Sequence, residues 1–226
     1  MKSYKIAAIP GDGIGKEVIA AGIEVLQALC KLESVGMTFE HFDWSSERYL
    51  KTGAYIPEGG LERLKGFDAI FFGAVGSPDV PDHLSLWGLR LPICQGFDQY
   101  ANVRPTRVLP GVTSRLEDAD KIDWVIVREN SEGEYSGSGG RVHRGLPEEI
   151  ATETSVFTRV GVERIHRFAF ELAQKRKRKL LTLVTKSNAQ RHGMVLWDEI
   201  FYEVAAKYPD VKTDRVLVDE IGRAHV

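Results

Sequence analysis

Charged and polar side chains follow directly after two apolar segments of the sequence. Residues 124–127 form a short apolar run that ends at Arg128, and a polar, glycine-rich stretch containing Tyr135 comes next. This switch places Arg128 and Tyr135 at or just beyond the carboxyl end of a buried strand, the edge of an open α/β sheet where ligands bind. Arginine offers a fork of donors to a carboxylate, and a phenol can donate a proton. The segment alone fits a carboxylate site and a purely structural loop equally well.

Lys186 occupies a similar position after the apolar run 180–185. Burying an ammonium group without a partner is costly, so a lysine here either performs base chemistry or simply reaches solvent where the strand ends. Without further context the second interpretation is the commoner one. A last strand is expected over residues 211–219, and it ends in Asp219.

Two glycine-rich loops also follow apolar runs. The turn 11–15 joins the expected strand 4–9 to a stretch with helical spacing at 16–32, and the loop 73–76 follows the run 69–72. The first turn has the spacing G-x-G-x-G rather than G-x-G-x-x-G, and no Walker lysine and hydroxyl pair accompanies it. We therefore expect a tight turn that packs near a ligand and not a phosphate cradle.

The order strand, loop, helix repeats along the chain, which predicts an α/β fold with a mostly parallel open sheet and helices on both faces. Pro92 is expected to kink or end a loosely helical segment at 83–97. We expect a cofactor-side domain over residues 1–100 and a substrate and dimerisation domain over 101–219. The glycine-rich, charged stretch 136–149 has no core pattern and is interpreted as an arm or lid of the second domain.

The amino-acid composition excludes some classes of function. The chain has 226 residues, 43% hydrophobic and 27% charged, with a formal net charge of −2. This balance argues against nucleic-acid and membrane-surface partners, and no apolar run approaches the length of a membrane span. Five consecutive basic residues at 175–179 are interpreted as cations at a helix C-terminus. Cys30 and Cys94 lack metal-ligand spacing, and such usage fits the cytoplasm.

The last seven residues, 220–226, do not continue the pattern of elements. They can be reverse-translated into a common sequencing-library adapter. We therefore expect them to be untrimmed read rather than protein, and we expect the natural chain to continue beyond Asp219.

Five short motifs occur in order along nearly the whole chain. They are Pro-Gly-Asp-Gly-Ile-Gly at 10–15, Phe-Gly-Ala-Val-Gly at 72–76, Asn-Val-Arg-Pro at 102–105, Val-Arg-Glu-Asn at 127–130 with Tyr135, and Thr-Lys-Ser-Asn at 185–188. With these motifs the chain resembles the β-decarboxylating dehydrogenases, which include isopropylmalate, isocitrate, tartrate and D-malate dehydrogenases. Segments 85–100 and 132–147 look most like the tartrate and D-malate branch.

The resemblance implies a fold and a reaction. The fold is an isopropylmalate dehydrogenase-like open sheet in two domains, of which the first lacks its second half here and should expose an apolar sheet edge or face. The reaction is NAD-dependent oxidation of a small 2-hydroxy dicarboxylic acid such as tartrate or D-malate, with loss of carbon dioxide from the product. The resemblance further implies Mg²⁺ or Mn²⁺, a monovalent cation such as K⁺, and a homodimer when the protein is full length.

The resemblance also implies roles for individual residues. Arg104 and Arg128 clamp substrate carboxylate, Lys186 is the base for the substrate hydroxyl, and Tyr135 protonates the enolate left by decarboxylation. Asp219 falls at the position of a metal-ligating aspartate that approaches the partner subunit's site. The residues implied at the nicotinamide end of the cofactor are Ile14, Gly73, Ala74, Val75 and Asn188.

The sequence departs from the family pattern in two places. The usual first substrate arginine falls at Cys94, while Arg90 lies about one helical turn earlier, where isopropylmalate enzymes carry apolar residues. An arginine there favours a small polar substrate such as tartrate or D-malate. A 3-isopropylmalate dehydrogenase is kept as the alternative enzyme. Two further metal aspartates and the loops for the adenine half of NAD would lie beyond Asp219. The 226-residue polypeptide by itself is therefore expected to be a non-catalytic fragment.

Overall fold

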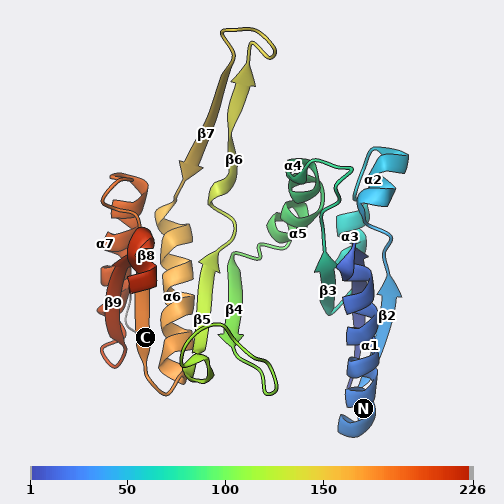
Figure 1. Ribbon diagram of the computed structural model, residues 1–226, viewed down its shortest axis with the longest axis horizontal. Coiled ribbons are helices and arrows are strands. Elements are labelled where there is room, and N and C mark those ends of the chain that lie inside the picture. The colour runs from blue at the N-terminus through green and yellow to red at the C-terminus, as the bar shows by residue number, and fades with distance from the viewer. Residues whose placement is uncertain (1, 224–226) are drawn as a thin grey trace. The chain divides into compact units, whose positions relative to one another are not determined.

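The computed structural model describes residues 2–223, with side chains described through residue 220. The chain folds into two compact units, and the boundary between them falls between Phe97 and Asp98. Helices and strands alternate in both units (Figure 1), so the predicted α/β class is confirmed. Residues 224–226, at the end of the segment expected to derive from an adapter, lie outside the described residues.

Unit 1 contains a three-stranded parallel sheet in the order β2-β1-β3. Its elements are β1 (Ser3–Gly11), α1 (Ile14–Glu33), β2 (Gly36–His41), α2 (Ser46–Thr52), α3 (Gly60–Leu64), β3 (Ala69–Ala74), α4 (Asp82–Ser85), η1 (Leu86–Arg90) and α5 (Leu91–Gly96). β3 is an apolar edge strand among the described strands, which agrees with the expectation of an exposed apolar edge.

The two faces of this sheet carry different cores. Ala8 points toward α1 and packs with Ile19 and Ile23. Its neighbours Ala7 and Ile9 point to the other face, where a larger cluster gathers side chains that follow β2 and come from α3, η1 and α5. Alternation along β1 thus buries both faces, as expected for a parallel strand covered on each side.

The backbone around the turn that joins β1 to α1 is packed too tightly for a side chain at Gly15 or Gly73. A Cβ on Gly15 would lie 2.2 Å from the backbone oxygen of Pro10, and a Cβ on Gly73 would meet the same oxygen at 2.2 Å. Asp12, which is buried, accepts hydrogen bonds from Ser46 N and Oγ at 2.7 Å each and from Gly76 N at 2.9 Å. The carboxylate of Asp12 therefore fixes the loop after β3 against the first turn.

The helical segment at the end of unit 1 differs from the expectation at Pro92. Residues 86–90 form a π-helical turn, and α5 then begins at Leu91 with Pro92 in its first turn. Of the two predicted outcomes, a kink or an end, the end is therefore wrong, because the helix continues past Pro92, and the α-helical pattern is instead interrupted by the π-helical turn directly before it. A proline is tolerated in the first turn because its missing N–H would have no partner within the helix there.

Unit 2 contains three two-stranded sheets, β4–β5, β6–β7 and β8–β9. Its elements are β4 (Ala101–Arg107), η2 (Ala119–Lys121), β5 (Asp123–Glu129), β6 (Gly133–Val142), β7 (Ile150–Val156), α6 (Arg159–Lys175), β8 (Leu180–Thr185), α7 (Gly193–Ala205), β9 (Lys212–Leu217) and η3 (Val218–Arg223).

Only one of these three sheets is parallel. β8 and β9 pair in parallel with α7 as their crossover, whereas β4–β5 and β6–β7 are antiparallel. The prediction of a mostly parallel sheet therefore holds in unit 1 but not throughout unit 2. Parallel neighbours need a crossover of a dozen or more residues, usually a helix, and neither the segment 108–122 nor the loop 143–149 contains such a helix.

The β6–β7 hairpin extends away from the helices of its own unit (Figure 1). It includes the stretch that the sequence marked as an arm or lid, and Val142, Leu146 and Ile150 are each more than half exposed near its tip. Apolar side chains exposed together near the tip of a hairpin form a candidate surface for a second chain.

The core of unit 2 lies between α6, α7 and β8. His166 on α6 is 96% removed from solvent and packs edge-on against the rings of Trp197 and Phe201, with Nε2 3.1 Å from the Trp197 carbonyl oxygen. Burial lowers the pKa of His166 to about 4, although the Trp197 carbonyl and Asp198 act in the opposite direction. The imidazole is therefore neutral in the folded protein near pH 7.

Because of the lowered pKa of His166, we expect the folded protein to lose stability in mild acid. A histidine with a lowered folded-state pKa binds protons more readily when unfolded, so stability is full above about pH 6.5 and falls toward pH 4, by about 3 kcal/mol in total. We expect His166→Gln to flatten the dependence of the unfolding free energy on pH in this range, as measured by urea denaturation. The exposed His192→Gln serves as the control, and an equal flattening in both variants would contradict the assignment.

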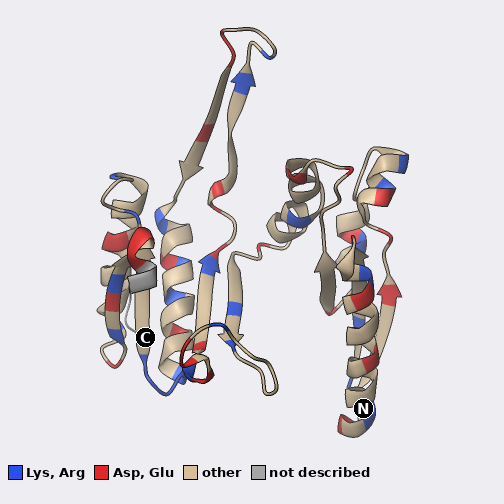
Figure 2. Ribbon diagram, in the orientation of Figure 1, with Lys and Arg blue, Asp and Glu red and all other residues tan. Residues whose placement is uncertain are grey.

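The basic run 175–179 lies at the end of α6 and in the loop that leads to β8 (Figure 2). Arg176 donates to the backbone oxygen of Asp123 at 2.6 Å, and Lys179 pairs with Asp210 at 2.9 Å. These contacts favour the structural interpretation of the run. Among the described residues, no helix combines the length and the apolar character that a membrane span requires.

Candidate functional site

Arg128 and Tyr135 lie together in unit 2. Arg128 is the penultimate residue of β5, and Tyr135 is near the start of β6. The Arg128 guanidinium donates a hydrogen bond to the Tyr135 hydroxyl oxygen and lies 4.9 Å from the centre of the Tyr135 ring. A cation over an aromatic face is favourable, so the guanidinium and the phenol form one preorganised pair.

The turn between β5 and β6 is held by its own side chains. Glu129 accepts hydrogen bonds from Ser131 Oγ at 2.6 Å and from Glu132 N at 2.7 Å. Glu132 in turn accepts from Thr158 N at 2.9 Å and from the Thr158 hydroxyl, at the N-terminus of α6. The polar sequence after Arg128 is thus a fixed turn that sets the separation of Arg128 and Tyr135.

Arg104 shares a face of the β4–β5 sheet with Arg128. Arg104 pairs with Ile126, and Arg128 lies two residues further along β5. Because side chains alternate along a strand, the two arginines are diagonal neighbours on the same side, a relation that corresponds to about 7–8 Å in antiparallel pairs. Both side chains are exposed. The sheet therefore presents two guanidinium groups in one direction, which suits a dicarboxylate.

Lys186 and Asp219 form a second pair. Lys186 follows β8 and Asp219 follows β9, and the parallel register of these strands brings both residues to the same end of the sheet. Lys186 Nζ forms a salt bridge with Asp219, and the Lys186 side chain retains 30% of its exposure. The lysine therefore has a carboxylate partner within its own chain, which neither sequence interpretation included.

These two pairs stand apart within unit 2. α6 packs against both β5 and β8, and in Figure 1 it lies between them. The Arg128–Tyr135 pair belongs to the β5 side of α6, and the Lys186–Asp219 pair belongs to the β8 side. The structure thus groups four of the predicted site residues of unit 2 into two pairs, the two half-sites of the predicted active site.

The predicted residues of unit 1 lie at the start of α1, at the end of β3 and in η1. Ile14 opens α1 and is 62% exposed, whereas Gly73 and Ala74 at the end of β3 and Val75 after it are half-buried, next to Gly76, which donates to Asp12. Arg90 is half-buried at the end of η1. Their contacts with cofactor and substrate stay predictions.

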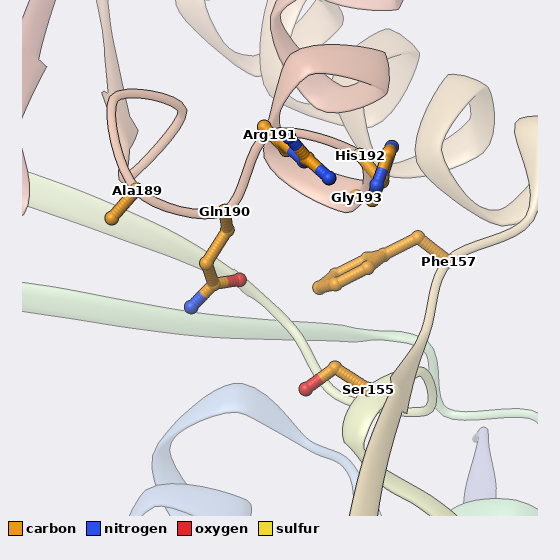
Figure 3. A pocket seen from close by; sticks show the side chains of 7 residues that line it. All are labelled: Ser155, Phe157, Ala189, Gln190, Arg191, His192 and Gly193. Atoms are coloured by element: carbon orange, nitrogen blue, oxygen red, sulfur yellow. The ribbon is translucent and has the colours of Figure 1, made fainter.

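Asn188 lies in the exposed turn that follows Lys186. The same turn begins an open pocket of about 450 Å³. Figure 3 shows its lining: Ser155, Phe157, Ala189, Gln190, Arg191, His192 and Gly193. No sequence pattern indicated this pocket, and most of the residues that line it, apart from Phe157 and Gly193, are exposed.

The described residues do not by themselves form a divalent-metal site. Asp219 is the one predicted metal ligand, and its carboxylate is engaged by Lys186. Between residues 2 and 220 no three His, Cys, Asp or Glu side chains gather closely enough to hold a metal ion. Mg²⁺ and Mn²⁺ prefer several oxygen ligands, so Asp219 could contribute only one of a larger set.

Two residues that the sequence interpretation passed over connect to Lys186. Ser187 Oγ donates to Asp198 Oδ2 at 2.7 Å, and the Asp198 side chain is only 15% exposed. Asp198 lies close to Trp197 and Ile200, which pack into the core of unit 2. A carboxylate near such apolar positions of a helix is the signal that could have indicated Asp198, because buried charges require partners.

Comparison with known proteins gives consistent results. The chain is 68% identical over 222 residues to a probable tartrate dehydrogenase/decarboxylase of Agrobacterium vitis, which covers 97% of this chain and 62% of that protein. It is 51% identical over 223 residues to the D-malate dehydrogenase (decarboxylating) of Escherichia coli strain K12, with the same two coverages. The chain thus spans about three fifths of the length of these curated relatives.

A solved structure and a family model agree with these relatives. The crystal structure of isocitrate dehydrogenase from Methylococcus capsulatus superimposes with a TM-score of 0.84 at 32% identity, over 97% of this chain and 62% of the other. The model of the isocitrate/isopropylmalate dehydrogenase family matches residues 5–226. The resemblance inferred from the five motifs is confirmed: the chain belongs to the isocitrate/isopropylmalate dehydrogenase family.

Proposed function

We propose that the full-length protein containing this chain oxidises a small 2-hydroxy dicarboxylic acid, tartrate or D-malate, with NAD as hydride acceptor and with decarboxylation of the product. The observation that carries the proposal is the pair of guanidinium groups, Arg104 and Arg128, on one face of the β4–β5 sheet, with the Tyr135 phenol bonded to Arg128. The names of relatives at 48–68% identity support the same substrate class.

Each side chain of unit 2 has a chemical task in this proposal. Arg104 and Arg128 bind and orient the carboxylates of the substrate. Lys186 removes the hydroxyl proton of the substrate, and NAD, when bound, would supply the acceptor for the hydride of the carbinol carbon. Tyr135 gives its proton to the enolate carbon after carbon dioxide departs, and the hydrogen bond from Arg128 stabilises the phenolate that remains.

We infer that a complete site combines two copies of the chain. Because α6 separates the half-sites, the Arg128–Tyr135 pair of one copy would act with the Lys186–Asp219 pair of its partner. A homodimer supplies both combinations by symmetry, and the exposed tip of the β6–β7 hairpin offers an apolar surface for such a contact. We propose Asp219 as one ligand of Mg²⁺ or Mn²⁺, with the other ligands outside the described residues, and we assign no chemical step to the metal.

The contributions of unit 1 rest on the resemblance. Arg90 would contact substrate, and the loop 73–75 with Ile14 would line the nicotinamide end of NAD, to which Asn188 would contribute from unit 2. The rigid hold of Asp12 on the loop supports this assignment, because a cofactor site requires a fixed backbone. A cytoplasmic location is proposed from the free state of both Cys30 and Cys94.

Steady-state kinetics on the full-length protein test the substrate assignment. We expect kcat/KM for NADH formation with D-malate or tartrate to exceed that with 3-isopropylmalate by at least about tenfold, since a methylene-scale mismatch in a pocket costs about 1–3 kcal/mol and an unpaired polar group costs more. A preference for 3-isopropylmalate would reverse the substrate assignment. No turnover of any of the three acids, with Mn²⁺ present, would contradict the proposal as a whole.

A further inference from the structure

Asp198 joins the two strands that carry the Lys186 half-site. It lies on α7, the crossover helix between β8 and β9, and its Oδ2 accepts a hydrogen bond from Ser187 Oγ at 2.7 Å. The same oxygen lies 3.4 Å from Nε of Arg215 on β9. One carboxylate oxygen thus contacts the residue directly after Lys186 and a residue four positions before Asp219.

The turn that follows Lys186 is closed by further hydrogen bonds. Ser187 N donates to Thr185 Oγ1 at 3.2 Å, and the amides of Ala189 and Gln190 donate to the carbonyl oxygen of Lys186 at 3.0 and 2.9 Å. These bonds define the shape of the turn, but each of them stays within residues 185–190. The bond from Ser187 to Asp198 connects the turn to α7 through side chains, in addition to the backbone bond from Met194 N to the Gln190 carbonyl oxygen at 3.1 Å.

One of the two carboxylate oxygens of Asp198 destabilises the folded state. Its Oδ1 is buried and accepts no hydrogen bond among the described residues, and a buried acceptor without a donor opposes folding. The buried residues of α7 are otherwise apolar: Ile200, Phe201 and Val204. The unsatisfied Oδ1 indicates that Asp198 has a role other than stabilising the fold. Its other oxygen, Oδ2, contacts Ser187 in the turn after Lys186.

We propose that Asp198 is a positioning residue for Lys186. Through Ser187 and Arg215 it fixes the turn after β8 relative to the end of β9, and so it sets where the Lys186 amine stands with respect to Asp219 and the substrate hydroxyl. This inference rests on the proposed role of Lys186 as the base. A displacement of about 1 Å in a catalytic group can reduce turnover about 100-fold, so loosening the turn acts on kcat.

The test compares substitutions at the two ends of the same sheet. Ser187→Ala removes the donor, Asp198→Ala removes the acceptor, and Asp198→Asn keeps an acceptor for Ser187. Asp210→Ala is the matched control, because Asp210 pairs with Lys179 at 2.9 Å and with Gln174 at 2.9 Å, at the opposite end of β8 and β9. It removes a comparable carboxylate far along the sheet from Lys186.

In the full-length protein with D-malate, we expect Ser187→Ala and Asp198→Ala each to lower kcat by about 10- to 100-fold while KM changes by less than about threefold. Asp198→Asn should recover most of the loss, and Asp210→Ala should leave kcat within about twofold. Values of kcat for Ser187→Ala and Asp198→Ala as high as that of Asp210→Ala would overturn the proposal, even if their melting temperatures fall. Ser187→Ala keeps the test valid if Asp198→Ala does not fold.

Two further measurements separate this inference from the function on which it rests. The first is the activity of Lys186→Met, assayed beside the other variants. If Lys186→Met stays active, the proposed role of Lys186 as the base is wrong. If Lys186→Met is inactive while Ser187→Ala has normal activity, only the positioning role of Asp198 is wrong. Hydrogen exchange on the full-length protein needs no activity. The amides of Ala189 and Gln190 should exchange at least about tenfold faster in Ser187→Ala than in Asp210→Ala, and equal rates would contradict the tether.

Discussion

Replacing Lys186 by methionine is expected to reduce kcat of the full-length protein by about 100- to 10,000-fold, the range over which a positioned general base contributes to a rate. Methionine keeps most of the length of the side chain but cannot accept the hydroxyl proton of the substrate. Its thioether also leaves Asp219 without the cation that it contacts in this structure. The measurement is NADH formation under saturating D-malate and Mn²⁺.

Lys186→Arg is the matched control for charge. Arginine can keep a salt bridge with Asp219, but it remains protonated at all working pH values and cannot serve as the base. We therefore expect Lys186→Arg to be almost as impaired as Lys186→Met. If Lys186→Arg were as active as the wild type, the lysine would act only through its charge on Asp219, and the role of base would be wrong.

Replacing Arg128 by lysine is expected to lower kcat/KM by about 10- to 100-fold, since a hydrogen bond to a charged group is worth about 1.5–3 kcal/mol. Lysine retains the positive charge but loses the planar fork that binds a carboxylate with two parallel hydrogen bonds. It also loses the flat contact with the Tyr135 ring. Most of the effect should therefore fall on the binding and the protonation of substrate, and not on protein stability.

Arg107→Lys provides the comparison for Arg128→Lys. Arg107 lies on β4, three residues from Arg104, and alternation along the strand places it on the opposite face of the sheet. Its side chain is exposed, so we expect Arg107→Lys to keep kcat/KM within about twofold. Equal losses in the two variants would indicate a general effect of positive charge on unit 2, and would contradict a carboxylate clamp at Arg128.

Several strands of this fold were predictable because they contain short apolar runs that end in glycine or charge, whereas β6, which lies in the glycine-rich stretch expected to form an arm or lid, was not predicted. The run 180–185 coincides with β8, and the run 124–127 lies inside β5. Local sequence indicates whether a segment is extended, and the predictions made from it were correct for β8 and β5. It does not decide the direction of a partner strand, which explains why the antiparallel pairing of β4 with β5 was not anticipated.

The candidate site was predictable residue by residue but not in its grouping. Arg128 and Tyr135 are seven positions apart, and the turn between them brings them together. Lys186 and Asp219 are 33 positions apart, and they meet only because β8 and β9 pair in parallel with a matched register. Such a contact depends on tertiary structure, so no local pattern around Lys186 reveals it.

Buried polar residues were the least predictable feature. His166 lies on the apolar face of α6, and Asp198 lies beside apolar positions of α7. In sequence, either could be an exposed residue at the margin of an amphipathic helix. Only the packing of α6 against α7 distinguishes a buried histidine or carboxylate from a solvated one.

Complementation between two inactive variants tests the composite site most directly. Arg128→Gln and Lys186→Met chains of the full-length protein carry different affinity tags, and the heterodimer is isolated after mixing. One of its two sites then combines intact Arg128 and Tyr135 from one chain with intact Lys186 and Asp219 from the other, so we predict about half of the wild-type kcat by symmetry. A heterodimer no more active than its parent variants would contradict the division of the site between two copies.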